Sequence, residues 1–189
     1  MDDVLQHFRD RGALLEGHFI LSSGLHSPKY LQCALAIEKS GDATSYGEAI
    51  ARHFRDHSIQ TVASPAIGGL VIGFAVAQAL GTRFIWTERQ DGKMTLRRGF
   101  SVDAGERILV VEDVITTGGS TRECIAALEI NGGGVVAAAS IIDRSDGTAD
   151  VGVERISLAR LAIPTYRSED CPMCGHGDTA VKPGSRSLK

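Results

Sequence analysis

A chain of 189 residues is long enough to bury the core of one α/β domain with small additions. Apolar residues make up 43% and charged residues 23%, the ordinary balance of a soluble globular protein. The net charge of -3 argues against a main role in holding nucleic acid. No apolar run approaches the roughly 18 residues of a membrane span, and the charged N-terminus lacks a signal core. We therefore expect a cytoplasmic protein without membrane or nucleic-acid partners.

The N-terminal part of the chain predicts a helix, a hairpin and a second helix. Residues 2–16 place apolar side chains at helical spacing. HFILSSGLHSPKYLQCA, at 18–34, predicts two short strands around a Gly/Ser/Pro turn. Residues 41–57 predict the next helix.

A short apolar strand, a Gly-rich turn and a helix then follow one another twice. The two units span 61–80 and 108–130, and further strands are expected at 83–87 and 135–143. Residues 154–163 fit either a strand or a short helix. Strands that alternate with helices predict a parallel sheet with helices on its faces.

Two stretches lack periodicity and are expected to be loops: 88–99, which is polar and basic, and the tail from Ser168. In the tail, Cys171 and Cys174 form a lone C-x-x-C. Zinc normally takes four ligands, and the sequence shows no second pair of cysteines at matching spacing. We therefore expect a packed tail turn and no metal there.

Cys33 and Cys124 lie in apolar segments and are expected to be buried thiols. No disulfide framework is indicated.

The strongest signal is ILVVEDVITTGGST, at 108–121. Its four leading apolar residues suit a strand that is buried on both faces, and ligands bind beyond the carboxyl ends of such strands. There the chain carries Glu112 and Asp113 and then a Thr/Gly turn. We expect Ser120 to cap the next helix, with Glu123 completing a capping box. Glycines and a helix N-terminus together predict a phosphate site, with the hydroxyls of the turn, including Thr121, as extra donors.

The two acids make this prediction more specific. They would repel a phosphate unless they face something else, and ribose hydroxyls are suitable donors to them. The alternative is a structural turn with two surface acids. A Walker phosphate loop is a poor rival, because the Gly-Lys-Ser/Thr triplet is absent.

This run of residues resembles the signature with which type I phosphoribosyltransferases bind phosphoribosyl pyrophosphate (PRPP). The resemblance implies an α/β fold with a type I phosphoribosyltransferase core, a parallel sheet flanked by helices, and a small N-terminal hood. We expect a single domain over 1–189, with the hood at 1–40, the core at 41–165 and a tail at 166–189.

The resemblance also implies a set of PRPP contacts. The turn at 116–121 would hold the 5-phosphate, the acid pair the ribose hydroxyls, and the earlier turn at 66–69 the pyrophosphate. A purely structural turn is the alternative at 66–69. The implied PRPP-binding residues are Arg89, Lys93, Ala66, Ile67, Gly68, Gly69, Glu112, Asp113, Val114, Ile115, Thr116, Thr117, Gly118, Gly119 and Ser120.

Three further features resemble the orotate phosphoribosyltransferases. They are the hairpin segment 19–32, Arg144 at the end of a strand, and the tail segment 171–186. In that family an arginine at this place binds the carboxylate of orotate, and a guanidinium fork suits a carboxylate. The alternative is a surface arginine that pairs with Asp143 or Asp146. The implied orotate-binding residues are Thr116, Arg144, Lys29 and Tyr30.

The basic segment 88–100 resembles the mobile lid of the same family, in which Arg89 and Lys93 match the first arginine and the catalytic lysine. A solvated charged loop is the alternative. The chain departs from the family at three positions, where it has Gln90, Thr95 and Ser22 in place of lysine, histidine and lysine. The implied catalytic residues are Lys93, Asp113 and Glu112.

The resemblance implies transfer of the 5-phosphoribosyl group of PRPP to N1 of orotate. Mg²⁺ is expected as the cofactor, carried by the pyrophosphate of PRPP and not bound directly by the protein. A homodimer that shares the 88–99 loop between subunits is expected too. A phosphoribosyltransferase for another base and a non-catalytic PRPP-sensing regulator are the alternatives.

Overall fold

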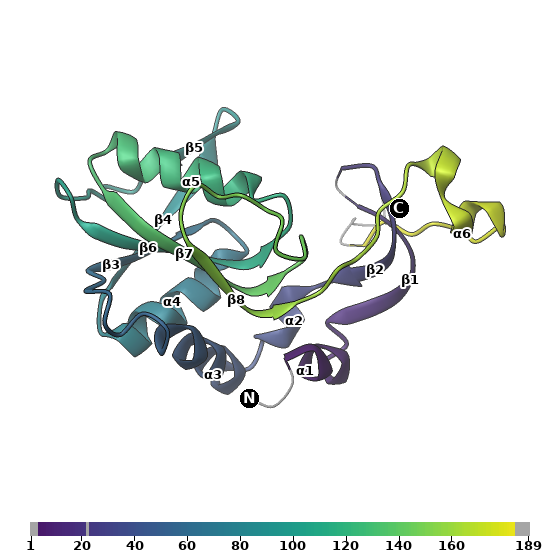
Figure 1. Ribbon diagram of the computed structural model, residues 1–189, viewed down its shortest axis with the longest axis horizontal. Coiled ribbons are helices and arrows are strands. Elements are labelled where there is room, and N and C mark those ends of the chain that lie inside the picture. The colour runs from purple at the N-terminus through teal and green to yellow at the C-terminus, as the bar shows by residue number, and fades with distance from the viewer. Residues whose placement is uncertain (1–3, 22, 184–189) are drawn as a thin grey trace.

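The computed structural model describes residues 4–21 and 23–183, which form a large six-stranded sheet and a separate two-stranded hairpin (Figure 1). The order of strands in the large sheet is β5-β4-β3-β6-β7-β8, and all neighbours are parallel except β4 and β5. The expected parallel sheet flanked by helices is therefore confirmed. Its strands are β3 (Thr61–Pro65), β4 (Arg83–Gln90), β5 (Lys93–Leu96), β6 (Arg107–Ile115), β7 (Gly134–Asp143) and β8 (Arg155–Arg160).

Helices cover both faces of this sheet (Figure 1). α5 (Gly119–Ile130) packs on one face, whereas α3 (Ser40–Ala51) and α4 (Gly69–Leu80) pack on the other. β6 is central and buried through most of its length, as a strand covered on both faces should be. Of the described helices, none is both long enough and apolar enough to cross a bilayer.

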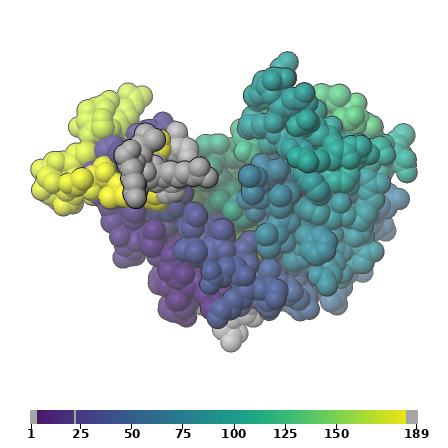
Figure 2. Space-filling model, turned by 180° about the vertical axis from the view of Figure 1, so that it is seen from behind, coloured from purple at the N-terminus to yellow at the C-terminus, as the bar shows by residue number. Residues whose placement is uncertain are grey.

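The N-terminal hairpin lies at one end of the molecule, beside the C-terminal segment of residues 166–183 (Figure 1). β1 (Leu14–Ile20) pairs antiparallel with β2 (His26–Leu31), which confirms the expected hairpin. The remaining short helices are α1 (Val4–Asp10), α2 (Cys33–Ala36), the 3-10 turn η1 (Ser168–Asp170) and α6 (Pro172–Gly175). Figure 2 shows the surface hollowed between this end and the core.

Several predicted boundaries are wrong. The first helix ends at Asp10 instead of continuing to residue 16, because Gly12 adopts φ 64° and Leu14 already begins a strand. The helix expected at 41–57 is α3, and it ends at Ala51 rather than at residue 57. For residues 154–163, where a strand and a short helix were both open, the strand is correct, as β8.

The segment 88–99 is a β-hairpin and not an irregular loop. β4 runs on to Gln90, and β5 returns beside it after the two-residue turn Asp91-Gly92. Both turn residues have positive φ, 51° and 80°, as a type I′ turn requires. The Asp-Gly pair is a sequence signal for such a turn, and the expectation of a loop at 88–99 overlooked it.

Candidate active site

The central strand β6 leads directly into the Thr/Gly turn. The strand ends at Ile115, Gly118 adopts φ 75° as the N-cap, and α5 begins at Gly119. A cavity of about 230 Å³ lies at this turn, where the first N–H groups of α5 have no intrahelical partner. Its lining comprises Arg89, Glu112, Val114, Ile115, Thr116, Thr117, Gly118, Gly119, Ser120, Thr121 and Glu123.

The expected capping box is wrong. The helix begins one residue before Ser120, its N-cap is Gly118, and no side chain bonds to the cap. Glu123 pairs instead with Arg89, whose Nη2 lies 2.6 Å from Glu123 Oε2. Because no side chain of the turn is used for capping, the hydroxyls of the turn stay available to a ligand.

Glu112 lines this cavity, whereas the neighbouring Asp113 is half-buried and lines a separate cavity together with Ile67 and Gly68. Glu112 is only 8% exposed, and the N–H of Val114 donates to Asp113 Oδ1 at 2.7 Å. Burial and the neighbouring charge of Asp113 raise the pKa of Glu112, and burial raises the pKa of Asp113. The pair is therefore short of donors, and ligand hydroxyls or a cation would stabilise its charged form.

The earlier turn packs against these acids. A β-carbon on Gly68 would lie 2.8 Å from Asp113 Oδ1, and one on Gly69 would lie 2.8 Å from the carbonyl oxygen of Val111. Only glycine fits there. The turn at 66–69 and the acid pair thus belong to one site, although they are separated by more than forty residues of sequence.

A second cavity, of about 380 Å³, adjoins the first and shares Thr116 and Thr117 with it. Arg144 lines it, held by a bond from its backbone N–H to the carbonyl oxygen of Ile115 at 2.8 Å. Among the described residues, the buried Nε of Arg144 has no hydrogen-bond partner, and burial lowers the pKa of the guanidinium. An anion in this cavity would supply the missing hydrogen-bond partner of Nε and stabilise the charged form of the guanidinium.

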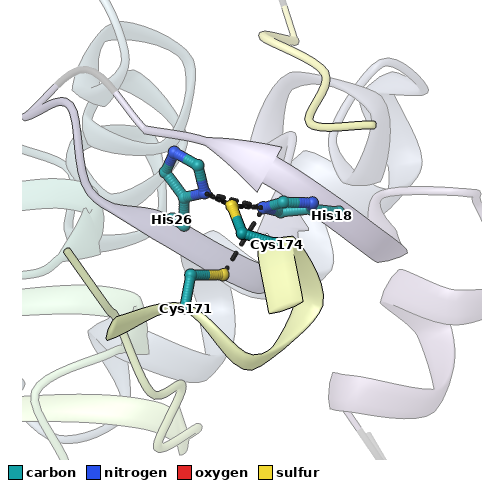
Figure 3. A group of neighbouring side chains, drawn as sticks. All are labelled: His18, His26, Cys171 and Cys174. Carbon is teal, nitrogen blue, oxygen red and sulfur yellow. Dashed lines mark hydrogen bonds between the residues drawn. The ribbon is translucent and has the colours of Figure 1, made fainter. Parts of the chain in front are cut away.

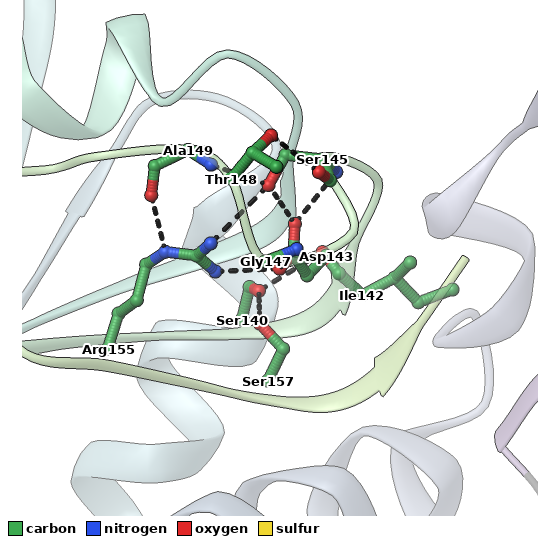
Figure 4. A network of polar contacts seen from close by, with 9 residues as sticks. All are labelled: Ser140, Ile142, Asp143, Ser145, Gly147, Thr148, Ala149, Arg155 and Ser157. Carbon is green, nitrogen blue, oxygen red and sulfur yellow. Dashed lines mark hydrogen bonds and ion pairs between the residues drawn. The ribbon is translucent and has the colours of Figure 1, made fainter. Parts of the chain in front are cut away.

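The alternative, a surface pairing of Arg144 with Asp143 or Asp146, is not formed among the described residues. Asp143 is fully buried and pairs with Arg155, whose Nη1 lies 2.8 Å from Asp143 Oδ2 (Figure 4). The carboxylate also accepts from Ser145 and from the N–H of Gly147. Burial would raise the pKa of Asp143, but the hydrogen bonds of Ser145 and Arg155 outweigh it and lower that pKa. This network fixes the loop that carries Arg144 and leaves the guanidinium free.

The hairpin of β4 and β5, which was expected to be the lid, places Arg89 and Lys93 in two different cavities. Arg89 reaches the phosphate cavity, and its Nη1 also donates to the carbonyl oxygen of Gly92 at 2.8 Å. Lys93 is exposed and lines a cavity on the outer face of α5, beside Ile130. In this conformation Lys93 does not line the phosphate cavity.

The N-terminal hairpin contributes less directly than expected. Lys29 forms an ion pair with Glu16, with Nζ 2.9 Å from Oε1, and Tyr30 packs on Phe19 with ring centroids 5.9 Å apart. Neither residue lines the cavity around Arg144. Burial and the charges of Asp113 and Glu112 raise the pKa of the Cys33 thiol, so the start of α2 lies close to the acid pair. Ser22 lies outside the described residues.

Sequence reasoning missed two groups of residues. Thr148, Ile163 and Thr165 line the cavity around Arg144, and only their closeness to the strand ends could have indicated this. His18 and His26 were also missed. The structure places both beside Cys171 and Cys174, so the premise that the tail cysteines lack a second pair of ligands is wrong.

A parallel sheet with a phosphate turn, a buried acid pair and a facing glycine turn at one edge defines a phosphoribosyltransferase. The profile of the family described as "Phosphoribosyl transferase domain" matches residues 42–157. The solved orotate phosphoribosyltransferase of Aeropyrum pernix is similar in structure, with a TM-score of 0.68 and 26% identity over 84% of this chain and 94% of that one.

Relatives of known function narrow the assignment from the phosphoribosyltransferases as a class to one family among them. The orotate phosphoribosyltransferase of Caldicellulosiruptor bescii is 49% identical over 98% of this chain and 97% of its own length. That of Thermotoga maritima is 50% identical over 94% of this chain and 95% of its own length. The chain belongs to the orotate phosphoribosyltransferase family.

Proposed function

We propose that this chain transfers the 5-phosphoribosyl group of PRPP to N1 of orotate, a step of de novo pyrimidine synthesis that gives orotidine 5-phosphate and pyrophosphate. One observation supports this choice of base more than any other. Arg144 faces a cavity beside the phosphate turn with a buried Nε that has no partner among the described residues. A carboxylate on the transferred base would supply that partner, and a neutral purine or uracil would not.

The 5-phosphate would bind at the start of α5. The free N–H groups there and the hydroxyls of Thr116, Thr117, Ser120 and Thr121 line one cavity. The positive end of the helix dipole favours an anion at this place. Thr116 and Thr117 also line the cavity of Arg144, so a ligand at the turn extends toward the proposed base site.

The acid pair would hold the ribose hydroxyls. Glu112 is buried and Asp113 is half-buried, and both carboxyls have raised pKa, as expected for acids that lack hydrogen-bond donors. The charged pair would also stabilise positive charge that develops on the sugar as its bond to pyrophosphate breaks. Oxygen ligands next to a glycine turn also fit Mg²⁺, which prefers carboxylate and phosphate oxygens. When bound to pyrophosphate, Mg²⁺ would neutralise part of the leaving group's charge.

The reaction needs no covalent bond to the protein. N1 of orotate loses its proton to pyrophosphate or solvent and forms a bond to C1 of the ribose, while the bond from C1 to pyrophosphate breaks and its electron pair leaves with pyrophosphate. The protein's part is to position both substrates and to stabilise an oxocarbenium-like transition state. Arg144 would orient orotate, and Ala66, Ile67, Gly68 and Gly69 would receive the pyrophosphate.

We further propose a homodimer that shares the 88–99 segment between subunits, with Lys93 serving the neighbouring site while Arg89 stays at the phosphate cavity of its own chain. Lys93 lies outside the phosphate cavity of its own chain, which favours action on another chain. An apolar surface suited to a subunit contact lies beside the site. Ile67 is 82% exposed, Phe74 60% and Val71 51%, values that are high for large apolar side chains.

The division into hood (1–40), core (41–165) and tail (166–189) remains part of this proposal, with residues 1–3, 22 and 184–189 outside the described structure. A cytoplasmic location is proposed as well. The function can be tested with a panel of bases, namely orotate, uracil, adenine and hypoxanthine, each mixed with PRPP and Mg²⁺ while pyrophosphate release is followed. Release with orotate alone supports the assignment. Faster release with another base, or binding of PRPP without release, would overturn it.

A further inference from the structure

The N-terminal hairpin and the C-terminal tail bring together four side chains of types that bind metals (Figure 3). His18 lies in β1 and His26 begins β2. Cys171 is the N-cap residue of α6, and Cys174 lies within that helix. The ligand atoms of all four lie within 4.8 Å of one another. In the part of the chain that the structure describes, no other cluster of three or more potential ligands is found.

The distances between these atoms approach those of a tetrahedral zinc site. With Zn–N of about 2.0–2.1 Å and Zn–S of about 2.3 Å, tetrahedral ligand atoms lie roughly 3.3–3.8 Å apart. Cys171 Sγ lies 3.5 Å from His18 Nε2, and Cys174 Sγ lies 3.3 Å from His26 Nδ1. Cys174 Sγ lies 3.8 Å from His18 Nε2. To reach tetrahedral geometry, the two ring nitrogens, 2.7 Å apart, would have to separate by some tenths of an ångström, and the most distant ligand atoms, within 4.8 Å, would have to approach each other.

The orientation of His18 also fits a ligand. Its Nδ1 lies 2.9 Å from the carbonyl oxygen of Asp178, and a carbonyl can only accept a hydrogen bond. The proton of a neutral ring is therefore on Nδ1, and the lone pair of Nε2 faces the cluster. A bond from the remote ring nitrogen to a carbonyl is the usual support of a metal-binding histidine.

The backbone places the cysteines against the hairpin before any metal binds. Tyr166 exchanges two backbone hydrogen bonds with His26, of 2.8 and 2.9 Å. Val181 donates to the carbonyl oxygen of His18 and accepts from Ile20, both at 2.8 Å. The segment that holds the cysteines is therefore fastened to the hairpin on both sides, so metal binding needs little reordering of the chain.

The burial of these side chains favours a cluster that holds a cation over one that is empty. His18 and His26 are each 7% exposed and Cys171 is 4% exposed, whereas Cys174 is exposed and leaves a path to solvent. Two imidazoles and two thiols satisfy one another only weakly, because a thiol is a poor donor and acceptor. A cation bound by two thiolates and two neutral imidazoles would satisfy all four groups.

We propose that His18, His26, Cys171 and Cys174 form a closed structural Zn²⁺ site, which fastens the C-terminal tail to the N-terminal hairpin. Four protein ligands of types N₂S₂ leave no open position for a substrate, so the role is structural. The site does not overlap the cavities assigned to PRPP and orotate. It therefore stands independently of the proposed function.

The first test measures metal in the purified full-length protein. After reconstitution with Zn²⁺ under reducing conditions and gel filtration, mass spectrometry of the elements should find about one zinc per chain. Cys171→Ser with Cys174→Ser should lose it. His176→Ala is the matched control, because His176 lies two residues beyond Cys174, is exposed and lies outside the cluster. Zinc lost in the control as well, or kept in the double variant, would overturn the site.

A second measurement uses the unchanged chain, so it does not depend on how a variant folds. Bound Zn²⁺ should protect Cys171 and Cys174 from alkylation in the native protein, and a chelator should expose both and lower the Tm. Co²⁺ in place of Zn²⁺ should give the visible bands of a tetrahedral thiolate complex. Alkylation of Cys174 that Zn²⁺ does not change, or a Tm that is unaffected by the chelator, would contradict the proposal.

Discussion

Arg89 Nη2 lies 2.6 Å from Glu123 Oε2, and this ion pair joins the end of β4 to the helix that follows the phosphate turn. Both side chains are about half exposed, so the pair itself adds little to stability. Its effect is on position, because it holds a guanidinium at the edge of the cavity formed by the turn. PRPP would meet a cation that is already in place.

Replacing Arg89 tests this role. We expect Arg89→Ala to raise the KM for PRPP about ten- to a hundredfold, because a charge-assisted contact to phosphate is lost. Glu123→Gln is the control, since it removes the ion pair but keeps the guanidinium. Steady-state kinetics should show little change in that control. An equal rise of KM in both variants would mean that Arg89 acts only through Glu123.

Replacing Arg144 separates the two substrates. We expect Arg144→Ala to weaken orotate binding by about ten- to a hundredfold, the loss of one charge-assisted pair of roughly 1.5–3 kcal/mol. PRPP affinity, measured by calorimetry on the same protein, should not change. Arg144→Lys should recover part of the orotate affinity, because it restores the charge without the fork. Unchanged orotate affinity in Arg144→Ala would remove this residue from the site.

The acid pair predicts that the free energy of unfolding of the substrate-free protein depends on pH. Burial raises the pKa of Glu112 above its ordinary value of 4.5, so the folded state binds this proton more tightly than the unfolded chain. This carboxyl therefore lowers the free energy of unfolding as the pH rises above 4.5. We expect Glu112→Gln to unfold in urea like the wild type at pH 5, and to be about 1–3 kcal/mol more stable at pH 8. Glu129→Gln, at an exposed position of α5, is the control. A difference from the wild type that is equal at both pH values would contradict the raised pKa.

Mixing two impaired variants, at an orotate concentration far below the KM of Arg144→Ala, tests the shared lid. Lys93→Ala should lower kcat about a hundred- to a thousandfold through loss of one transition-state contact. If each lid serves the other chain, a mixed dimer with Arg144→Ala contains one site with both defects and one intact site. Random pairing after joint unfolding and refolding should then recover about a quarter of wild-type activity. No recovery after verified subunit exchange would show that each lid serves its own chain.

The sheet and the phosphate turn were predictable because their signals are local. A run such as ILVV followed by Glu112 and Asp113 contains the strand, its burial and its ligand end within a few residues. The position of the turn at 66–69 followed from the same repeat. Its direct packing on Asp113 did not, since that depends on how β3 and β6 pair.

The errors arose where tertiary partners override local patterns. Glu123 has the spacing of a capping box with Ser120 but bonds to Arg89, which comes from another strand. His18 and His26 carry no recognisable spacing relative to Cys171 and Cys174, because the two pairs meet only when the tail pairs with the hairpin. Nothing in a local window indicates such a meeting.

The central claim is catalysis of orotate transfer by this site, and the absorbance of orotate measures it most directly. On mixing the protein with PRPP and Mg²⁺, the absorbance should fall as orotidine 5-phosphate forms, with one pyrophosphate released per orotate consumed. Asp113→Asn should fold as the wild type does and lose about a hundred- to a thousandfold in kcat, since one electrostatic contact to the transition state is removed. No change of absorbance with the wild type, or turnover by Asp113→Asn within a few-fold of the wild type, would contradict the account.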